Sequence, residues 1–242
     1  MKLTFFGTSH GAPEVGRFCS GTLLETDGVS YLIDCGAPVD ALMRNRGKRI
    51  EDLAAIFITH MHEDHMGTLP AMVKEFGHYH PTAHGTFCLP EEGAIEALAA
   101  WNRAMHASEN PRITYRTVTD GVIYEDDHVT VTAIRTAHIH PFPSYAYDIR
   151  CKAENKSVLF TGDLRADLSD FPKTAHETHR TAVVSELTHF RVEQHTDTFA
   201  ACDCDLLIFH HMIAYNTEKM PDIIPQLPMH VHVANDGDEI VL

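Results

Sequence analysis

Side chains that commonly bind metal ions crowd the stretch FITHMHEDHMGTL, residues 57–69, directly after an apolar run. The cluster consists of His60, His62, Asp64 and His65. Imidazole and carboxylate groups bind Zn²⁺, Mn²⁺ or Fe²⁺, and four of them so close together can be divided between two adjacent ions. In an extended loop His60 and His62 point the same way, whereas Asp64 and His65 can turn to a second centre. We expect a dinuclear metal site, and the alternative is a solvated polar loop.

The elements that must position this cluster can be read from the pattern of apolar residues. Strands are expected at 3–8, 21–26, 29–36, 53–59, 112–118, 122–136, 144–151, 157–163, 182–187, 204–211 and 230–236, and helices at 37–47, 68–77 and 91–107. The Asp27-Gly28 pair predicts a two-residue hairpin turn, and Gly47 suits a helix end. Several buried runs end on polar clusters, which predicts a site at one edge of the molecule.

Two β-rich halves flanked by helices predict two sheets packed face to face with helices outside. We therefore expect an α/β protein with a four-layer αββα sandwich. The length of 242 residues fits a single domain spanning 1–242.

The composition of the chain limits the kinds of partner that the protein can bind. A formal charge of −15 opposes binding to extended nucleic acid, which requires a basic surface. No apolar run is long enough for a membrane span, and the N-terminus MKLTFFGTSHG lacks a signal-peptide pattern, so we expect a cytoplasmic protein without a membrane partner. The six cysteines are dispersed, which favours reduced structural thiols over disulfides.

The segments FFGTSHGAPEVGRFCSGTLLE, YLIDCG and the histidine cluster resemble the metallo-β-lactamase-fold hydrolases, in the branch that contains ribonuclease Z and small phosphodiesterases. The similarity covers nearly the whole chain. It implies the αββα sandwich and a dinuclear metal site, in which His60 and His62 serve the first ion and Asp64 and His65 the second. The two ions are expected to be zinc, with manganese or iron as alternatives.

The resemblance also implies three further ligands. The segment HPFPSYAYDI matches a family ligand with His140, although His138 lies two residues earlier on the same expected strand face. The bridging aspartate of the family looks like Asp163 in VLFTGDL, and the last ligand looks like His211 in LLIFHHM. Alternatives to His211 are its neighbour His210 and, in an expected β-hairpin, His230 and His232.

A histidine that contacts the substrate in the family resembles His189 in SELTHF, with His195 as a competitor. The expected catalytic residues are therefore Asp64 and His189, the latter protonating the leaving oxygen. Asp34 is expected to fix a ligand imidazole from behind or merely to cap a turn. Ser144 and Thr161 are expected to orient site groups or to satisfy strand backbone, and Arg17 to meet a phosphate or to be solvated.

The family chemistry implies hydroxide generated between two ions that also offset the charge of the reacting phosphate. Ribonuclease Z carries a long tRNA-gripping insertion between the positions matching His140 and Asp163, where this chain has only residues 141–162. We therefore expect a phosphodiesterase that acts on a small or cyclic phosphodiester. Alternatives are a lactone, ester or thioester hydrolase with the same site and a non-enzymatic metal-binding scaffold. A homodimer is one possible oligomeric state.

Overall fold

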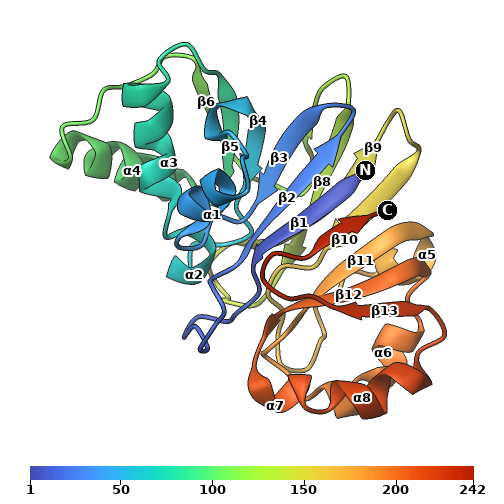
Figure 1. Ribbon diagram of the computed structural model, residues 1–242. Coiled ribbons are helices and arrows are strands. Elements are labelled where there is room, and N and C mark those ends of the chain that lie inside the picture. The colour runs from blue at the N-terminus through green and yellow to red at the C-terminus, as the bar shows by residue number, and fades with distance from the viewer.

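Two seven-stranded sheets form the centre of the computed structural model, which describes residues 1–242 (Figure 1). The first sheet has the order β14-β1-β2-β3-β4-β5-β6, with β1 Lys2–Gly7, β2 Gly21–Thr26, β3 Val29–Ile33, β4 Leu53–Phe57, β5 Gly85–Leu89, β6 Ile113–Thr117 and β14 Glu239–Val241. The second has the order β13-β12-β11-β10-β9-β8-β7, with β7 Gly121–Glu125, β8 Val129–Thr136, β9 Ser144–Cys151, β10 Lys156–Phe160, β11 Arg180–Leu187, β12 Cys204–Met212 and β13 His230–Val233.

Helices cover the outer face of each sheet, on opposite sides of the molecule in Figure 1. The helices are α1 Val39–Asn45, α2 Glu63–Met66, α3 Leu69–Lys74, α4 Glu92–Ala104, α5 Thr174–Glu177, α6 Thr196–Ala200, α7 Ala214–Thr217 and α8 Met220–Ile223. Short 3₁₀ turns occupy Ile50–Asp52, Val192–Gln194 and Ile224–Gln226, and a π-turn at Glu75–Tyr79 continues α3. The expected four-layer αββα sandwich is confirmed.

Alternation of side chains along the strands builds three apolar layers. In β4, Ala55 and Phe57 face the core between the sheets, whereas Ile56 packs outward under α1, α3 and α4. In β11, Val184 lies in the same central core and Val183 packs under α6 and α8. Each sheet is therefore buried on both faces over most of its area.

Local sequence explains the hairpin between β2 and β3. Asp27 and Gly28 both have positive φ, 50° and 77°, as a two-residue turn of type I′ requires. Gly47, with φ of 67°, follows the end of α1 in the left-handed conformation that favours glycine. Both expectations are confirmed.

The C-terminal part differs from the sequence expectation. Strand β13 pairs parallel to β12, so His230 and His232 do not lie on a β-hairpin. Strands β10, β11, β12 and β13 are mutually parallel, as are β3, β4, β5 and β6. The carboxyl ends of parallel strands meet at one edge of a sheet, where open α/β sheets commonly bind their ligands.

None of the helices combines the length and the apolar character that crossing a membrane requires. All six cysteines are buried and free of disulfides, as the sequence predicts.

A partly buried polar link joins the two sheets near β3. Asp126, in the turn between β7 and β8, accepts hydrogen bonds from Tyr31 Oη at 2.6 Å and Tyr124 Oη at 2.9 Å. It also accepts the backbone N–H groups of His128 and Val129, each at 2.8 Å. Burial opposes ionisation of Asp126, but these donors hold the pKa of its carboxyl below the usual range.

Asp126→Ala is expected to lower the free energy of unfolding by about 2–4 kcal/mol, because two phenols and two amides lose a charged acceptor. A carboxyl with a depressed pKa stabilises the fold above its unfolded value and loses that contribution as the pH falls through the folded one. The difference from wild type, measured by urea unfolding, should therefore be full at neutral pH and shrink below about pH 4. The exposed neighbour Asp127 provides the control, and an equal loss in Asp127→Ala would contradict the link.

Candidate metal centre

The carboxylate of Asp163 lies at the centre of the polar cluster, at the carboxyl end of β10. Its Oδ2 atom is 3.6 Å from His60 Nε2, 3.4 Å from His65 Nε2 and 3.7 Å from His138 Nε2. The same oxygen is 3.3 Å from His211 Nε2, and Asp163 is only 3% exposed. Four imidazoles from three other regions of the chain thus converge on one buried oxygen.

Three groups of ligand-type atoms meet at this point, and the third, Asp163, His189 and His211, overlaps the other two. The first group is His60, His62, His138 and Asp163, and the second is Asp64, His65 and His211; the ligand atoms of each group lie within 4.8 Å of one another. Asp163 contacts members of both groups, as a carboxylate between two ions must.

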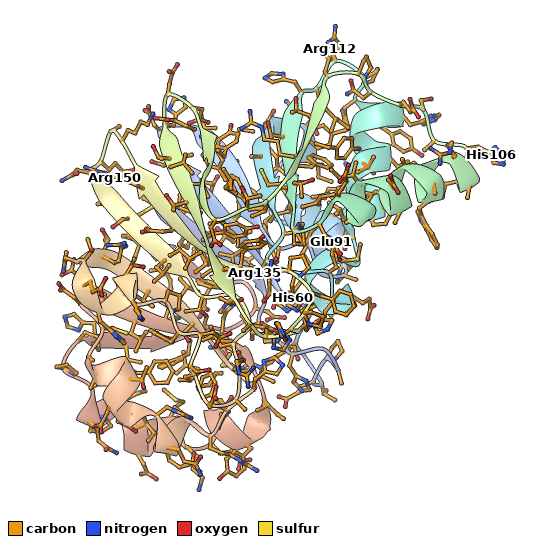
Figure 2. All side chains as sticks on the ribbon, turned by 180° about the vertical axis from the view of Figure 1, so that it is seen from behind. His60, Glu91, His106, Arg112, Arg135 and Arg150 are labelled. Atoms are coloured by element: carbon orange, nitrogen blue, oxygen red, sulfur yellow. The ribbon has the colours of Figure 1, made fainter.

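The loop after β4 supplies four of the seven residues in the first two groups, and His60 lies at the lower end of the strands in Figure 2. His60 and His62 converge as predicted, with His60 Nε2 2.9 Å from His62 Nδ1. Asp64 and His65 lie in the single turn α2, where the sequence predicts a loop. This turn places Asp64 Oδ2 at 3.3 Å from His65 Nε2 and 3.8 Å from His211 Nε2.

His138, and not His140, belongs to the cluster. Strand β8 ends at Thr136, so the alternation that would place both histidines on one strand face no longer applies. The chain turns instead, His138 Nδ1 lies 3.2 Å from the carbonyl oxygen of Leu164, and its Nε2 faces Asp163. His140 is exposed and takes no part in the metal-ligand groups. The structure therefore brings His138, the alternative from the sequence, to the cluster in place of the expected His140.

A β-bulge selects His211 over His210. Glu186 pairs with His210 and Leu187 with Met212, so His211 is the extra residue of β12. Its φ of 50° is strained for a residue other than glycine, and the bulge turns its side chain toward the cluster. His210 is directed to Phe5, with ring centroids 6.0 Å apart, and burial lowers the pKa of its imidazole to about 3.

The alternatives in β13 lie outside the cluster. His230 is exposed, and His232 Nε2 lies 2.8 Å from Asp238 Oδ2. Neither belongs to a group of metal-ligand atoms.

The rear nitrogen of each converging imidazole is held by a neighbour, which turns Nε2 toward Asp163. Asp34 Oδ2 lies 2.7 Å from His65 Nδ1, and Ser20 Oγ lies 2.8 Å from His211 Nδ1. Thr59 Oγ1 lies 3.1 Å from His60 Nδ1. The sequence indicated Asp34 but neither hydroxyl: Thr59 is recognisable only as the neighbour of His60, and Ser20 is 191 residues from its partner.

Asp34 also accepts the Thr59 backbone N–H at 2.8 Å, so one buried carboxylate orders both the loop and the imidazole. Asp34→Ala is expected to weaken metal affinity about 10–100-fold, the usual effect of removing such a support. Competition titration with a chelating indicator measures the change. Asp127→Ala should leave affinity unaltered, and unchanged affinity in a folded Asp34→Ala protein would contradict this support.

Burial and charge set the protonation states of the cluster. Burial and the neighbouring imidazole of His65 hold the pKa of His60 well below its usual value, and burial likewise lowers the pKa of His138. Burial alone would raise the pKa of Asp163, but His211, His65 and His60 hold it well below the usual range. Neutral imidazoles beside an ionised carboxylate are the forms in which these groups bind metal ions.

His65 is the exception in the metal-free protein. Burial lowers the pKa of its imidazole, but the carboxylates of Asp163 and Asp34 outweigh burial and raise that pKa well above its usual value. An ion bound at Nε2 must therefore displace a proton.

The residues fit two divalent ions. His65 Nε2, His138 Nε2 and Asp163 Oδ1 are buried atoms without a hydrogen-bond partner in the protein, which is costly unless something else satisfies them. Ligands about 2.0–2.1 Å from a tetrahedral zinc ion lie about 3.4 Å apart, and the separations around Asp163 Oδ2 match that spacing.

His189 stands beside the cluster, its Nδ1 3.8 Å from Asp163 Oδ2. A buried glutamate, Glu186, lies 2.7 Å from the same Nδ1 and also accepts the backbone N–H of Leu164. Burial lowers the pKa of His189, but Glu186 outweighs it and raises that pKa to about 9. His195 instead packs on the ring of Phe190, with centroids 5.8 Å apart. Sequence reasoning missed Glu186, whose only signal is a carboxylate ending the apolar run of β11.

Three other residues for which the sequence suggested a role at the site form hydrogen bonds within the protein. Arg17 Nη2 donates to Asn235 Oδ1 at 2.9 Å, which ties the N-terminal loop to the turn after β13. Ser144 Oγ accepts from Thr136 Oγ1 at 2.8 Å, and Thr161 Oγ1 donates to the Gly162 carbonyl at 2.7 Å. All three therefore have partners within the protein.

Comparison with known sequences finds a matching protein family and several relatives. Residues 1–218 match the family described as "Anti-Pycsar protein Apyc1". The chain is 32% identical over 151 residues to a ribonuclease Z from Exiguobacterium sp., which covers 62% of this chain and 48% of that protein. A ribonuclease Z from Picosynechococcus sp. is 30% identical over 57% of this chain and 44% of its own length. The chain thus spans about half the length of these curated relatives.

Solved structures share the fold across the whole chain. The metallo-β-lactamase fold protein YhfI from Bacillus subtilis superposes with a TM-score of 0.78, at 17% identity and 99% coverage of both chains. The short form of human tRNase Z gives 0.77, at 19% identity, with 100% of this chain and 99% of that chain covered. The chain has the metallo-β-lactamase fold, in the branch of ribonuclease Z, and it belongs to the Apyc1 anti-Pycsar protein family.

Proposed function

We propose that the protein is a metal-dependent phosphodiesterase that hydrolyses a small or cyclic phosphodiester. The observation that carries this proposal is the convergence of four imidazole Nε2 atoms within 3.3–3.7 Å of Asp163 Oδ2. His60, His62 and His138 would hold one ion, Asp64, His65 and His211 the other, and Asp163 both. Two divalent ions at such a site supply hydroxide at neutral pH and offset the charge of a reacting phosphate.

The chain's own residues do the positioning and the proton transfer. Asp34, Ser20 and Thr59 hold the ligand imidazoles, so little reorganisation is needed when substrate arrives. His189 is 31% exposed at the edge of the cluster, and Glu186 keeps its imidazole protonated at neutral pH. Its Nε2 is therefore suited to give a proton to the leaving oxygen, with Glu186 stabilising the charge at Nδ1.

The chain segment between His138 and Asp163 favours a small substrate. Residues 139–162 contain only a short turn and the antiparallel strands β9 and β10, so no inserted arm is available to grip a folded RNA. The formal charge of −15 also opposes binding to an extended polyanion. A zinc pair is favoured by the histidine-rich ligands, and manganese or iron fits the same groups. We also propose a single domain and, from six free thiols, a cytoplasmic location.

Metal-depleted protein restored with Zn²⁺ or Mn²⁺ tests the reaction class, with bis(p-nitrophenyl) phosphate as substrate. Turnover that returns with either ion supports phosphodiester chemistry. A panel of cyclic mononucleotides and a tRNA precursor then separates small from polymeric substrates. Turnover of a lactone or thioester without turnover of any diester would contradict the proposal and favour the ester-hydrolase alternative.

A further inference from the structure

A cavity of about 500 Å³ lies between α3, α4 and β6, the helices that Figure 1 shows beside the first sheet. Its volume is within the usual range of small-molecule sites. None of its lining residues belongs to a group of metal-ligand atoms, and none of them is basic. The cavity is therefore separate from the metal cluster, and it lacks the positive charge that recognises a phosphate.

One face of α4 supplies the wall of this cavity. Ile95, Ala99 and Asn102 line it and are four and three residues apart, which places them on the same side of the helix. The adjoining positions Ala94 and Leu98 are buried in the layer above the sheet. This apolar stripe predicts another apolar residue at position 102, but the residue there is an asparagine that is only 6% exposed.

Asn102 carries a buried acceptor that nothing in the protein satisfies. Its Nδ2 donates to the Leu98 carbonyl oxygen at 3.0 Å, within the helix. Its Oδ1 is buried and has no hydrogen-bond partner. A buried acceptor of this kind is costly unless another molecule donates to it. A donor group inside the cavity would remove that cost.

The loop after α4 closes the cavity and is held firmly in place. Asn110 lines the cavity, and its Nδ2 donates to the carbonyl oxygens of Phe76 and Ala83, each at 2.9 Å. The loop also packs directly on Gly77, where a Cβ atom would lie 2.0 Å from the Ser108 carbonyl oxygen. The wall therefore has its shape before any ligand binds, which lowers the entropy cost of binding.

Glu109 and Tyr115 make one part of the cavity negative. Glu109 is exposed, and Tyr115 is half-buried with its ring edge-on to Phe87, at 5.7 Å between ring centroids. Burial and the charge of the Glu109 carboxylate raise the pKa of Tyr115 to about 12, so Tyr115 is a neutral phenol at neutral pH. A carboxylate and an electron-rich ring both attract a cation.

We propose that this cavity binds a small organic ammonium ion with a compact apolar body. The ammonium group donates to Asn102 Oδ1 beside Glu109, and the apolar body lies on the apolar face of α4. An anion would meet the Glu109 carboxylate and no basic side chain, whereas a purely apolar molecule would leave Asn102 Oδ1 unsatisfied. The inference does not depend on the proposed phosphodiesterase function, because the cavity shares no residue with the metal cluster.

Amide NMR titration of isotope-labelled, zinc-loaded protein with phenethylamine and with phenethyl alcohol tests this assignment. The two probes have nearly the same shape, and only the amine is charged at neutral pH. Wild-type protein is expected to bind the amine about 10-fold more tightly, with shifts concentrated in residues 95–115, because the ammonium group adds charge-assisted hydrogen bonds. Equal affinities, no shifts with the amine, or shifts confined to residues 60–65 would overturn the proposal. An affinity that falls as protein concentration rises would also overturn it, since a second copy of the chain would then cover the cavity.

Asn102→Leu separates a binding role from a structural one. The variant is expected to bring the ratio of the two affinities to within about 2-fold of unity. Its midpoint of thermal unfolding should be unchanged or higher, because the substitution removes an unsatisfied buried acceptor and leucine favours helices more than asparagine does. A lower midpoint together with an unchanged ratio would indicate a purely structural asparagine and overturn the proposal.

Glu109→Gln tests the charge at an exposed position, where folding is not at issue. This variant is expected to lower the affinity ratio about 3-fold. Glu96, an exposed glutamate of α4 that does not line the cavity, gives the matched control Glu96→Gln, which should keep the ratio. A Glu109→Gln protein with the full ratio, or a control that loses it, would overturn the proposal.

Discussion

Asp163→Ala is expected to lower phosphodiester turnover at least about 10³-fold, the largest effect of any single substitution in this protein. The reason is geometric, because the carboxylate oxygen Asp163 Oδ2 faces the Nε2 atoms of imidazoles from both ligand groups. Without this carboxylate each group loses a negatively charged ligand, and nothing spans the two. Metal content and turnover measured on the same sample report both losses.

Folding of the variant must be checked beside activity. Asp163 Oδ1 has no hydrogen-bond partner in the protein, so the isosteric Asp163→Asn variant should keep the fold while losing the second ion. Asp205→Ala, at an exposed aspartate on the other end of β12, serves as the matched control. Unchanged turnover in a folded Asp163→Ala protein would contradict the dinuclear mechanism.

His138→Ala is expected to lower turnover about 10²–10⁴-fold, whereas His140→Ala should remain within about 2-fold of wild type. The two histidines are two positions apart, yet only His138 faces Asp163, at 3.7 Å between Nε2 and Oδ2. Its rear nitrogen is held by the Leu164 carbonyl, which sets the direction of the ring. The two variants therefore serve as matched controls for each other. Steady-state kinetics with a metal titration measures both.

The opposite ranking of these two variants would contradict the site as described. Equal and large losses in both would indicate that the turn after β8 is rearranged when ions bind. Added Zn²⁺ should partly restore His138→Ala, because the three remaining ligands of its group still converge.

The sequence predicted the sheets well because apolar runs bounded by turn residues carry local information. The Asp27-Gly28 hairpin and the strands around it needed nothing beyond nearest neighbours. Strands β5 and β14 were missed, since five and three residues without a strong flanking signal give little periodicity. The parallel pairing of β13 depends on contacts with β12 that no local pattern encodes.

The residues of the candidate site also fall into those that the sequence could predict and those that it could not. His60, His62, Asp64 and His65 are adjacent in the chain, so their spacing alone indicated a metal centre. The choice between His138 and His140 depended on where β8 ends, and strand ends are the least predictable features of a sequence. His211 reaches the cluster through a bulge that needs the register of β11 and β12. Ser20 and Glu186 act through contacts that exist only after folding.

Metal stoichiometry tests the central claim most directly. Protein stripped with a chelator and titrated with Zn²⁺ would be assayed in each sample for bound ions, by mass spectrometry of the metal, and for turnover of bis(p-nitrophenyl) phosphate. The structure predicts saturation at two ions per chain, with turnover rising as the second ion binds. Saturation at one ion, or full turnover in stripped protein, would contradict a dinuclear centre bridged by Asp163.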